Sequence, residues 1–163
     1  MKAIFVDCDG VLNASVSKSR CEGYTGLDDD KLERLKQIVD ATDAHIILSS
    51  TWRLGYNRDG RLAPFGNYLK RKFKRHQLEV YDVTPDFGRR GWLRGEEILD
   101  WLVKHPDVDR YLILDDEEYD FYKIGHEIID YWIQTEYYSD FGGLQDEHVK
   151  KAIEILNGKE DEQ

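Results

Sequence analysis

Three apolar runs along the chain each end directly before polar or acidic residues. The first, Lys2–Val6, is typical of a short buried strand, because Ala3 to Val6 form an unbroken apolar stretch. Ala44–Leu48 and Tyr111–Leu114 have the same character. The pattern therefore predicts three strands whose carboxyl ends carry the polar residues.

Stretches with helical periodicity separate these strands. A helix is expected after Asp28–Asp30, which offer caps and favourable charge at its start, and it ends near Thr42. Glu96–Lys104 also has its apolar residues at helical spacing, and Pro106 lies just beyond its end. The remaining predicted elements are helices at Asn67–His76, Tyr119–Ile124 and Gln145–Leu156, and strands at Leu78–Val83 and Tyr131–Thr135.

This alternation predicts an α/β fold with a mostly parallel sheet flanked by helices. The strand-helix-strand order at the start of the chain implies a parallel pair. In such sheets, ligands bind beyond the carboxyl ends of the strands. The polar residues of chemical interest all fall there: Asp7 and Asp9, Ser49 and Ser50, and Asp115 and Asp116.

A length of 163 residues fits one domain, expected over residues 1–157, with a polar tail at 158–163. No apolar run approaches the roughly 18 residues that a bilayer span needs, and no charged leader precedes the first strand. We therefore expect a cytoplasmic protein. Cys8 and Cys21 have no metal-binding spacing, so ordinary reduced thiols are expected.

The net charge of −10 argues against a protein that coats nucleic acid over a broad face, because such binding needs many phosphate contacts from Lys and Arg. A local basic site is still compatible with this charge. The middle third of the chain is basic against an acidic background, through Lys70, Arg71, Lys72, Lys74, Arg75, Arg89, Arg90 and Arg94. For residues 70–75 alone, a solvated helix face is the favoured interpretation.

Asp7 and Asp9 form an Asp-x-Asp-Gly sequence directly after the first strand. With this spacing, the first carboxylate can attack phosphorus while the second handles the proton of the leaving group. Gly10 allows a sharp turn beside such a site. A calcium loop also begins this way, but it needs further oxygen ligands where Val11 and Leu12 are apolar here.

A second acidic pair, Asp115 and Asp116, follows the third strand. Two sets of carboxylates at neighbouring strand ends can hold one hard cation, for which Mg²⁺ is the natural choice. A divalent ion also relieves the repulsion between the carboxylates and attracts a phosphate dianion. The alternative for this pair alone is a solvated turn that caps a helix.

Hydroxyl and cationic side chains complete the expected phosphate site. Ser49, Ser50 or Thr51 can donate a hydroxyl to a phosphoryl oxygen, although each can equally cap a helix, and the sequence does not select among them. A cation must offset the charge that builds up in the transition state. Arg94 is the first candidate and Arg53 the second, with surface charge as the alternative for both.

The four segments around Asp7-Cys8-Asp9-Gly10-Val11, Ser49, the basic residue near a helix start, and Asp115-Asp116 with Asp120 resemble the ordered motifs of the haloacid dehalogenase (HAD) superfamily. The resemblance covers most of the chain. Finer features resemble the phosphatase-like domains of RNA-repair proteins of the polynucleotide kinase-phosphatase type: ILSSTWR, LRGEEILDWL, YLILDD and a late GGL before the last helix.

The resemblance implies a Rossmann-like HAD fold and a phospho-aspartyl intermediate on Asp7, with Asp9 as acid and then base. It also implies that Mg²⁺ is held by the Asp7 carboxylate, the Asp9 backbone carbonyl, and Asp115 or Asp116, and that Ser49 contacts the phosphoryl group. The superfamily usually has a lysine at its third motif, where this chain offers arginine. Asp9 favours a phosphatase over a dehalogenase, because a departing halide needs no proton whereas an alkoxide does.

Neither gap between the motifs is long enough for a full cap domain, so no large cap is expected. An open site would admit the phosphorylated end of a polymer, and the leading hypothesis is a phosphatase for 3'-phosphate ends of RNA or DNA. Trp52, Tyr56 or Phe65 can stack on a base, although such aromatic residues more often belong to the core.

Three alternatives remain open at this stage. The first is a small-molecule or nucleotide phosphatase, which the acidic net charge favours. The second is a metal-binding or phosphate-binding module that has lost turnover, although every expected acidic position is filled. The third is a receiver-type phosphoacceptor domain. Such a domain carries its acid pair after the first strand and its acceptor aspartate after the third, with no Asp-x-Asp nucleophile, so the order of acidic residues in this chain disfavours it.

Overall fold

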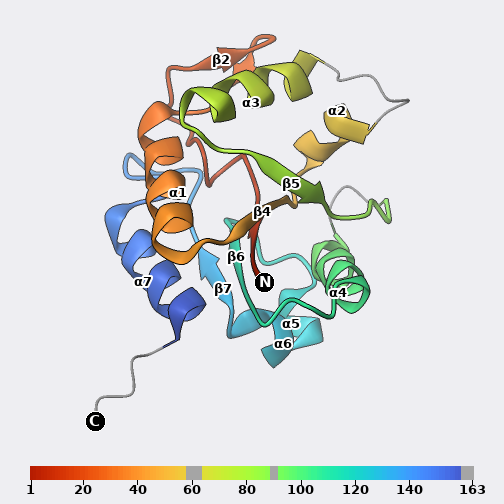
Figure 1. Cartoon of the computed structure of the whole chain (residues 1–163). Helices are drawn as coiled ribbons and strands as arrows, with labels where there is room; N and C mark the ends of the chain where they lie inside the picture. Colours follow the sequence, from red (N-terminus) through yellow and green to blue (C-terminus); the bar gives the residue numbers. More distant parts are fainter. Residues whose placement is uncertain (58–63, 89–91, 159–163) are drawn as a thin grey trace.

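The sheet of this protein consists of parallel strands. The computed structural model describes residues 1–57, 64–88 and 92–158, without the side chains of residues 56 and 57. The order of the strands is β5-β4-β1-β6-β7, and every neighbouring pair is parallel (Figure 1). The strands are β1 (Lys2–Val6), β4 (His45–Leu48), β5 (Val80–Val83), β6 (Arg110–Asp115) and β7 (Trp132–Gln134).

The register aligns the carboxyl ends of the three central strands. Val6 pairs with Leu48 on one side and with Leu114 on the other. The pairing continues past the strand ends, because the Asp7 N–H donates to the Leu114 carbonyl at 3.0 Å and the Ser49 N–H donates to the Val6 carbonyl at 2.9 Å. The polar residues that follow β1, β4 and β6 therefore lie at one level of the sheet.

Helices cover both faces of the sheet, because alternate residues of each buried strand point to opposite sides. On one face, Ile4 and Val6 of β1 pack with α1 (Asp29–Thr42), α3 (Pro64–Arg75) and α7 (Asp146–Asn157). On the other face, Ala3 and Phe5 pack with α4 (Arg94–Lys104), α5 (Phe121–Ile124) and α6 (His126–Ile129). Figure 1 shows α1 and α7 on one side of the strands and α4, α5 and α6 on the other.

The predicted strands and helices are all found, with ends displaced by a few residues, and the α/β class with a parallel sheet is confirmed. The sequence analysis missed several short elements. These are a hairpin of β2 (Arg20–Cys21) and β3 (Tyr24–Thr25), a 3₁₀ turn η1 (Thr51–Arg53), α2 (Leu54–Asn57) and α6. The hairpin turns at Glu22 and Gly23, both with positive φ, which is local turn geometry that hydrophobic periodicity does not report.

The described residues form no large cap domain. The segment between β1 and α1 contains the small hairpin, and the segment between β4 and β5 contains η1, α2 and α3. None of the helices described is long and apolar enough to cross a membrane. The predicted polar tail lies almost wholly outside the described residues, beyond the end of α7.

Candidate active site

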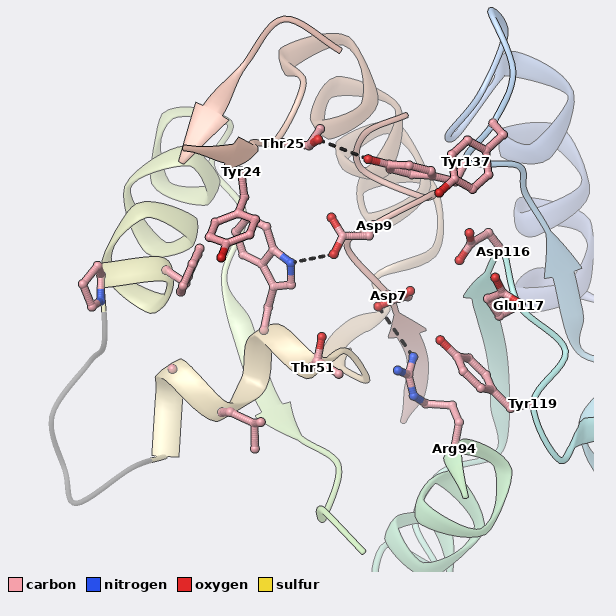
Figure 2. A pocket seen from close by; sticks show the side chains of 16 residues that line it. Asp7, Asp9, Tyr24, Thr25, Thr51, Arg94, Asp116, Glu117, Tyr119 and Tyr137 are labelled. Atoms are coloured by element: carbon pink, nitrogen blue, oxygen red, sulfur yellow. Dashed lines mark hydrogen bonds and ion pairs between the residues drawn. The ribbon is translucent and has the colours of Figure 1, made fainter. Parts of the chain in front are cut away.

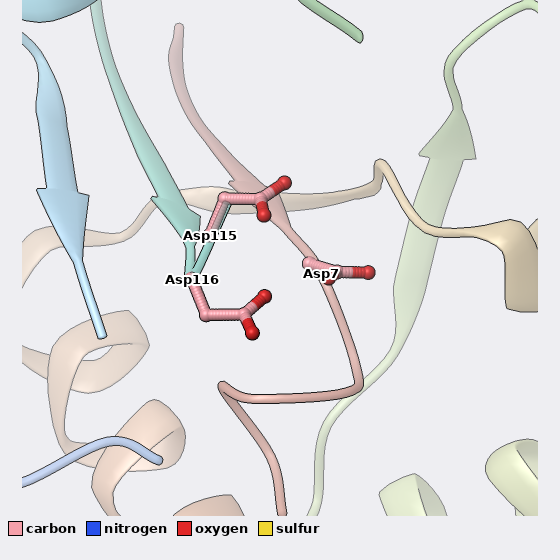
Figure 3. A group of neighbouring side chains, drawn as sticks. All are labelled: Asp7, Asp115 and Asp116. Atoms are coloured by element: carbon pink, nitrogen blue, oxygen red, sulfur yellow. The ribbon is translucent and has the colours of Figure 1, made fainter. Parts of the chain in front are cut away.

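Three carboxylates from two central strands converge beyond the sheet. Asp7 follows β1, while Asp115 and Asp116 lie at the end of the neighbouring strand β6. Each residue offers one oxygen atom, and these atoms lie within 4.8 Å of one another (Figure 3). Asp7 and Asp115 are buried, and Asp116 is half-buried. The structure thus brings together three of the acidic residues that the sequence analysis assigned to one site.

Burial raises the pKa of all three carboxyl groups, and the charge of Asp7 adds to this effect at Asp115 and Asp116. Desolvation raises the pKa of Asp7, against the opposing effects of the Arg94 charge and a hydrogen bond from the Ser50 side chain. Desolvation and the Asp7 charge raise the pKa of Asp115 well above its ordinary value. The same two causes raise the pKa of Asp116 to about 7. The positive charge of Arg94 therefore does not fully neutralise the three carboxylates. A group of oxygen ligands with uncompensated negative charge is suited to a hard divalent cation.

Gly10 permits the close approach of the two acidic segments. Its φ is +83°, a conformation that favours glycine. A Cβ atom at this position would lie 2.3 Å from Cγ of Asp116. The turn after Asp9 therefore needs glycine both for its backbone conformation and for the space that Asp116 occupies.

Asp9 lies outside the carboxylate cluster and is exposed. The Trp52 indole N–H donates to its Oδ2 at 3.1 Å, and the Asn13 amide donates to its Oδ1 at 2.9 Å (Figure 2). This arrangement holds a carboxylate at the entrance of the site, where it can reach a leaving group. The sequence analysis missed both partners, because neither Trp52 nor Asn13 belongs to the Asp-x-Asp-Gly pattern.

Arg94 is the cation of the cluster. Its guanidinium is 1% exposed, donates to Oδ2 of Asp115 at 2.7 Å and lies 3.6 Å from Oδ1 of Asp7. Its Cζ also lies 4.7 Å from the centre of the Tyr119 ring. Burial alone would lower the pKa of Arg94, but the charges of Asp115 and Asp7 outweigh burial and raise it. The guanidinium is therefore permanently charged.

Asp120 fixes the start of the helix that carries Arg94. Its carboxylate accepts hydrogen bonds from the backbone N–H groups of Gly95 at 2.7 Å and Glu96 at 3.1 Å. These are otherwise unpaired donors of the first turn of α4, next to the positive end of the helix dipole. Asp120, which the resemblance grouped with the fourth motif, thus binds the helix end and does not belong to the carboxylate cluster.

The hydroxyl residues after β4 have different positions. Ser50 donates to Asp7, and its oxygen accepts the Trp52 backbone N–H at 3.2 Å. Thr51 lines the cleft above the carboxylates. Ser49 contributes its carbonyl oxygen, which accepts a hydrogen bond from Arg94, whereas its buried hydroxyl has no partner among the described residues. Ser50 therefore contacts Asp7 and Thr51 lines the cleft, while the phosphate contact expected of Ser49 or Ser50 stays a prediction.

Arg53, the second choice for a phosphate contact, pairs with another side chain and does not line the cleft. Its guanidinium is 3% exposed and pairs with the fully buried Glu97 at 2.8 Å. It also donates to the Ser50 carbonyl at 2.8 Å. Arg53 lines a different cavity, beside Asp82 and Trp101, so its charge serves to connect the serine turn to α4. The physical reason is the proximity of Glu97, which no motif spacing discloses.

The carboxylates open into a cleft of about 840 Å³. Arg94 contributes the sole Lys or Arg side chain among its described lining residues, and the cations of α3 lie elsewhere, with Lys72 bound to Asp29. Arg89 and Arg90 lie outside the described residues, as does the side chain of Tyr56. The described lining consists of Asp7, Asp9, Tyr24, Thr25, Thr51, Trp52, Leu54, Gly55, Pro64, Phe65, Arg94, Asp116, Glu117, Tyr119, Tyr137 and Tyr138.

Comparison with known proteins agrees with this geometry. The sequence of residues 3–149 matches a family described as the HAD domain in Swiss Army Knife RNA repair proteins. No curated protein matches the chain. The match extends from β1 into α7 and includes every residue of the carboxylate cluster. On this basis, the chain belongs to the family of HAD domains found in Swiss Army Knife RNA repair proteins.

Proposed function

We propose that this protein is a Mg²⁺-dependent phosphomonoesterase that acts through an aspartyl-phosphate on Asp7. The observation that carries the proposal is the convergence of Asp7, Asp115 and Asp116 beside the buried Arg94. Bound Mg²⁺ would neutralise the carboxylates and the substrate phosphate, and polarise the phosphoryl group for attack. Asp7, Asp115 and Asp116 offer its side-chain ligands, and the Asp9 backbone carbonyl is the further ligand that we propose.

In the first half-reaction, a carboxylate oxygen of Asp7 attacks phosphorus and the ester P–O bond breaks. Asp9 in its protonated form donates its proton to the departing alkoxide oxygen. In the second half-reaction, Asp9 accepts a proton from water as the water oxygen attacks phosphorus. Inorganic phosphate leaves, and the Asp7 carboxylate is restored.

The other polar residues orient and stabilise the phosphoryl group. Ser50 already donates to the Asp7 carboxylate, and the Thr51 side chain lines the cleft nearby. Ser49 acts through its backbone carbonyl by fixing Arg94. Arg94 is a fixed positive charge that offsets the negative charge of Asp7, Asp115 and the transferring group. This assignment gives arginine the role for which the superfamily usually has lysine.

We further propose that the substrate is a 3'-phosphate end of RNA or DNA. Membership in a family of RNA-repair HAD domains supports a phosphatase-type function on nucleic-acid ends. The absence of a large cap among the described residues also supports it, because a polymer end can then approach Asp7 through the open cleft.

A small-molecule or nucleotide phosphatase is the second candidate. It is favoured by the acidic lining of the cleft, where Asp9, Asp116 and Glu117 would repel the further phosphates of a polymer. The net charge of −10 acts in the same direction.

The decisive experiment compares phosphate release from 3'-phosphorylated RNA and DNA oligonucleotides with release from the corresponding mononucleotides. We expect Mg²⁺-dependent turnover, a higher kcat/KM for the oligonucleotides, and loss of activity in Asp7→Asn. Equal or better turnover of the mononucleotides would favour the second candidate. Failure to hydrolyse any phosphate ester, including a generic aryl phosphate, would instead identify a module that binds without turnover.

A further inference from the structure

Aromatic side chains from three separate segments form one wall of the cleft. Tyr24 comes from the hairpin, Trp52 from the 3₁₀ turn after β4, and Phe65 from α3. The ring centres of Tyr24 and Phe65 are 5.9 Å apart, and those of Trp52 and Phe65 are 5.7 Å apart. These distances lie in the range of packed aromatic pairs, so the three rings form a continuous apolar surface. We call Tyr24, Trp52 and Phe65 the aromatic wall.

One ring of the aromatic wall, that of Tyr24, is displayed to solvent, and the hairpin that carries it is held in place. Tyr24 is 69% exposed and lines the cleft, so its ring is accessible to a ligand bound there. Two hydrogen bonds hold the end of the hairpin that carries Tyr24. Thr25 hydrogen-bonds to the Tyr137 hydroxyl at 3.1 Å, and Asn13 donates to the Gly26 carbonyl at 2.8 Å. In Figure 2, Tyr24 and Tyr137 lie on either side of Asp9, above Asp7.

Trp52 connects the aromatic wall to the reacting centre. Its ring packs on Phe65, and its N–H donates to the Asp9 carboxylate at 3.1 Å. The wall therefore begins beyond the residue that serves the leaving group. A group that contacts the wall is attached to the substrate on the leaving-group side of the phosphate.

The charges in the cleft restrict what this group can be. The described lining includes the carboxylates of Asp9, Asp116 and Glu117, and its cation Arg94 is already paired with Asp7 and Asp115. A further phosphate would meet repulsion there, whereas a neutral planar group would gain contacts with the exposed ring of Tyr24 and the half-buried ring of Phe65. Stacking on aromatic side chains is a common means of binding bases without contacts to their phosphates.

We propose that the aromatic wall binds, by stacking, the nucleobase of the nucleotide that carries the phosphate. This inference rests on the proposed function, because it assigns the recognition of the leaving group at the same site. In the substrate, the sugar ring separates the base from the 3'-phosphate. In the cleft, Asp9 lies between Asp7 and the aromatic wall, so the sugar would lie beside Asp9 when the phosphate is at Asp7 and the base is at the wall. The protein should thus favour a terminal nucleotide that is unpaired, since an unpaired base can offer either face to the rings, whereas a paired base at the end of a duplex offers only its outer face.

The test compares two substrates that differ by the base alone: a single-stranded oligonucleotide ending in a 3'-phosphorylated nucleoside, and the same oligonucleotide ending in a 3'-phosphorylated abasic sugar. We expect Tyr24→Leu and Phe65→Leu to lower kcat/KM for the base-containing substrate roughly 5- to 100-fold, as stacking energies per base imply. The abasic substrate should be hydrolysed at nearly the wild-type rate. A third arm uses a 3'-mononucleotide, which should show the same selective loss if the base alone is recognised.

Tyr24→Phe keeps the ring, so this variant should retain the higher kcat/KM of the wild type for the base-containing substrate over the abasic one. Tyr122→Leu is the matched control, because Tyr122 is 62% exposed on α5 and does not line the cleft. Equal losses of kcat/KM on base-containing and abasic substrates in Tyr24→Leu and Phe65→Leu would overturn the inference while leaving the phosphatase proposal intact. A higher kcat/KM of the wild type for a phosphotyrosine peptide than for the oligonucleotide would have the same consequence. If the wild-type protein hydrolysed none of these substrates, the phosphatase proposal itself would be refuted.

Discussion

The Trp52 indole N–H donates a hydrogen bond to the Asp9 carboxylate at 3.1 Å. Trp52 is 8% exposed and packs against both Phe65 and Tyr68, so its position is fixed by the core. Asp9, in contrast, is exposed and would otherwise adopt several side-chain conformations. The indole therefore limits the directions in which Asp9 presents its proton. This makes Trp52 a positioning residue for the proposed proton transfer.

Trp52→Phe should lower kcat about 10-fold with little change in KM, because it keeps the aromatic ring but removes a hydrogen bond to a charged group. The loss should be largest for alkyl phosphates, whose alkoxide must be protonated as it leaves. It should be small for aryl phosphates with good leaving groups. Steady-state kinetics on the two substrate classes would measure the difference.

Trp101→Phe is the matched control for this prediction. Trp101 donates its own indole N–H to an aspartate, Asp82, at 2.7 Å, but it lies outside the cleft. The control should leave the ratio of alkyl to aryl turnover unchanged. An equal effect of the two substitutions, or an equal effect of Trp52→Phe on both substrate classes, would mean that Trp52 does not position Asp9.

Arg94 neutralises carboxylates that are themselves buried, so its replacement should affect stability as well as activity. Arg94→Gln leaves Asp7 and Asp115 without their cation, and we expect it to lower the free energy of unfolding by roughly 3–5 kcal/mol in the absence of metal. Activity should fall at least 100-fold. Arg94→Lys keeps the charge and should retain most of the stability and part of the activity. Urea unfolding and phosphate release would measure both; unchanged activity in Arg94→Gln would contradict the role assigned to Arg94.

The sequence was sufficient to predict the sheet and the acidic site because both depend on local patterns. Buried parallel strands such as Lys2–Val6 are unbroken apolar runs, and the carboxyl ends of such strands meet at one edge of the sheet. Asp7 and Asp115 follow two such runs, so their convergence follows from topology. Arg94 was identified because it begins a helix next to this edge.

The partners of these residues could not be predicted, because they depend on packing between segments distant in the chain. Arg53 pairs with Glu97, and Asp9 with Trp52, across 44 and 43 positions respectively. The hairpin that displays Tyr24 consists of two-residue strands, which are too short to produce an alternating pattern. Sequence patterns therefore located the clustered carboxylates but not the residues that contact them or most of those that line the cleft.

Arg53 and Glu97 form a buried ion pair, which permits a test of whether Arg53 serves this pair or the phosphate site. Arg53→Met leaves the carboxylate of Glu97 buried without its cation, and the free energy of unfolding should fall by roughly 3–5 kcal/mol. The double substitution Arg53→Met with Glu97→Met should recover much of this loss, because neither charge is then left unpaired. Urea unfolding of the four proteins measures the coupling. A raised KM for phosphate esters with unchanged stability would instead return Arg53 to the phosphate site.

The raised pKa of Asp116 predicts how stability depends on pH in the metal-free protein. Its pKa is about 7 in the folded state and 3.8 as an ordinary carboxyl, so the folded protein holds this proton more tightly than the unfolded chain. The resulting contribution to stability is complete below about pH 4 and is lost as the pH rises through about 7. Asp116→Asn, which never ionises, should therefore gain Tm relative to wild type between pH 5 and pH 8.

Mg²⁺ should narrow this difference in Tm at pH 8, because it binds the ionised cluster and stabilises the folded state by about 2.7 kcal/mol at a concentration 100 times its Kd. Asp116→Asn lacks one of the three carboxylates, so its Tm should respond much less to the metal. Asp140→Asn removes an exposed carboxylate outside the cluster and is the matched control. Thermal unfolding at pH 5 and pH 8, with and without Mg²⁺, gives all the required comparisons. If wild type and Asp116→Asn gained the same Tm from Mg²⁺, the cluster of Asp7, Asp115 and Asp116 would not be the metal site.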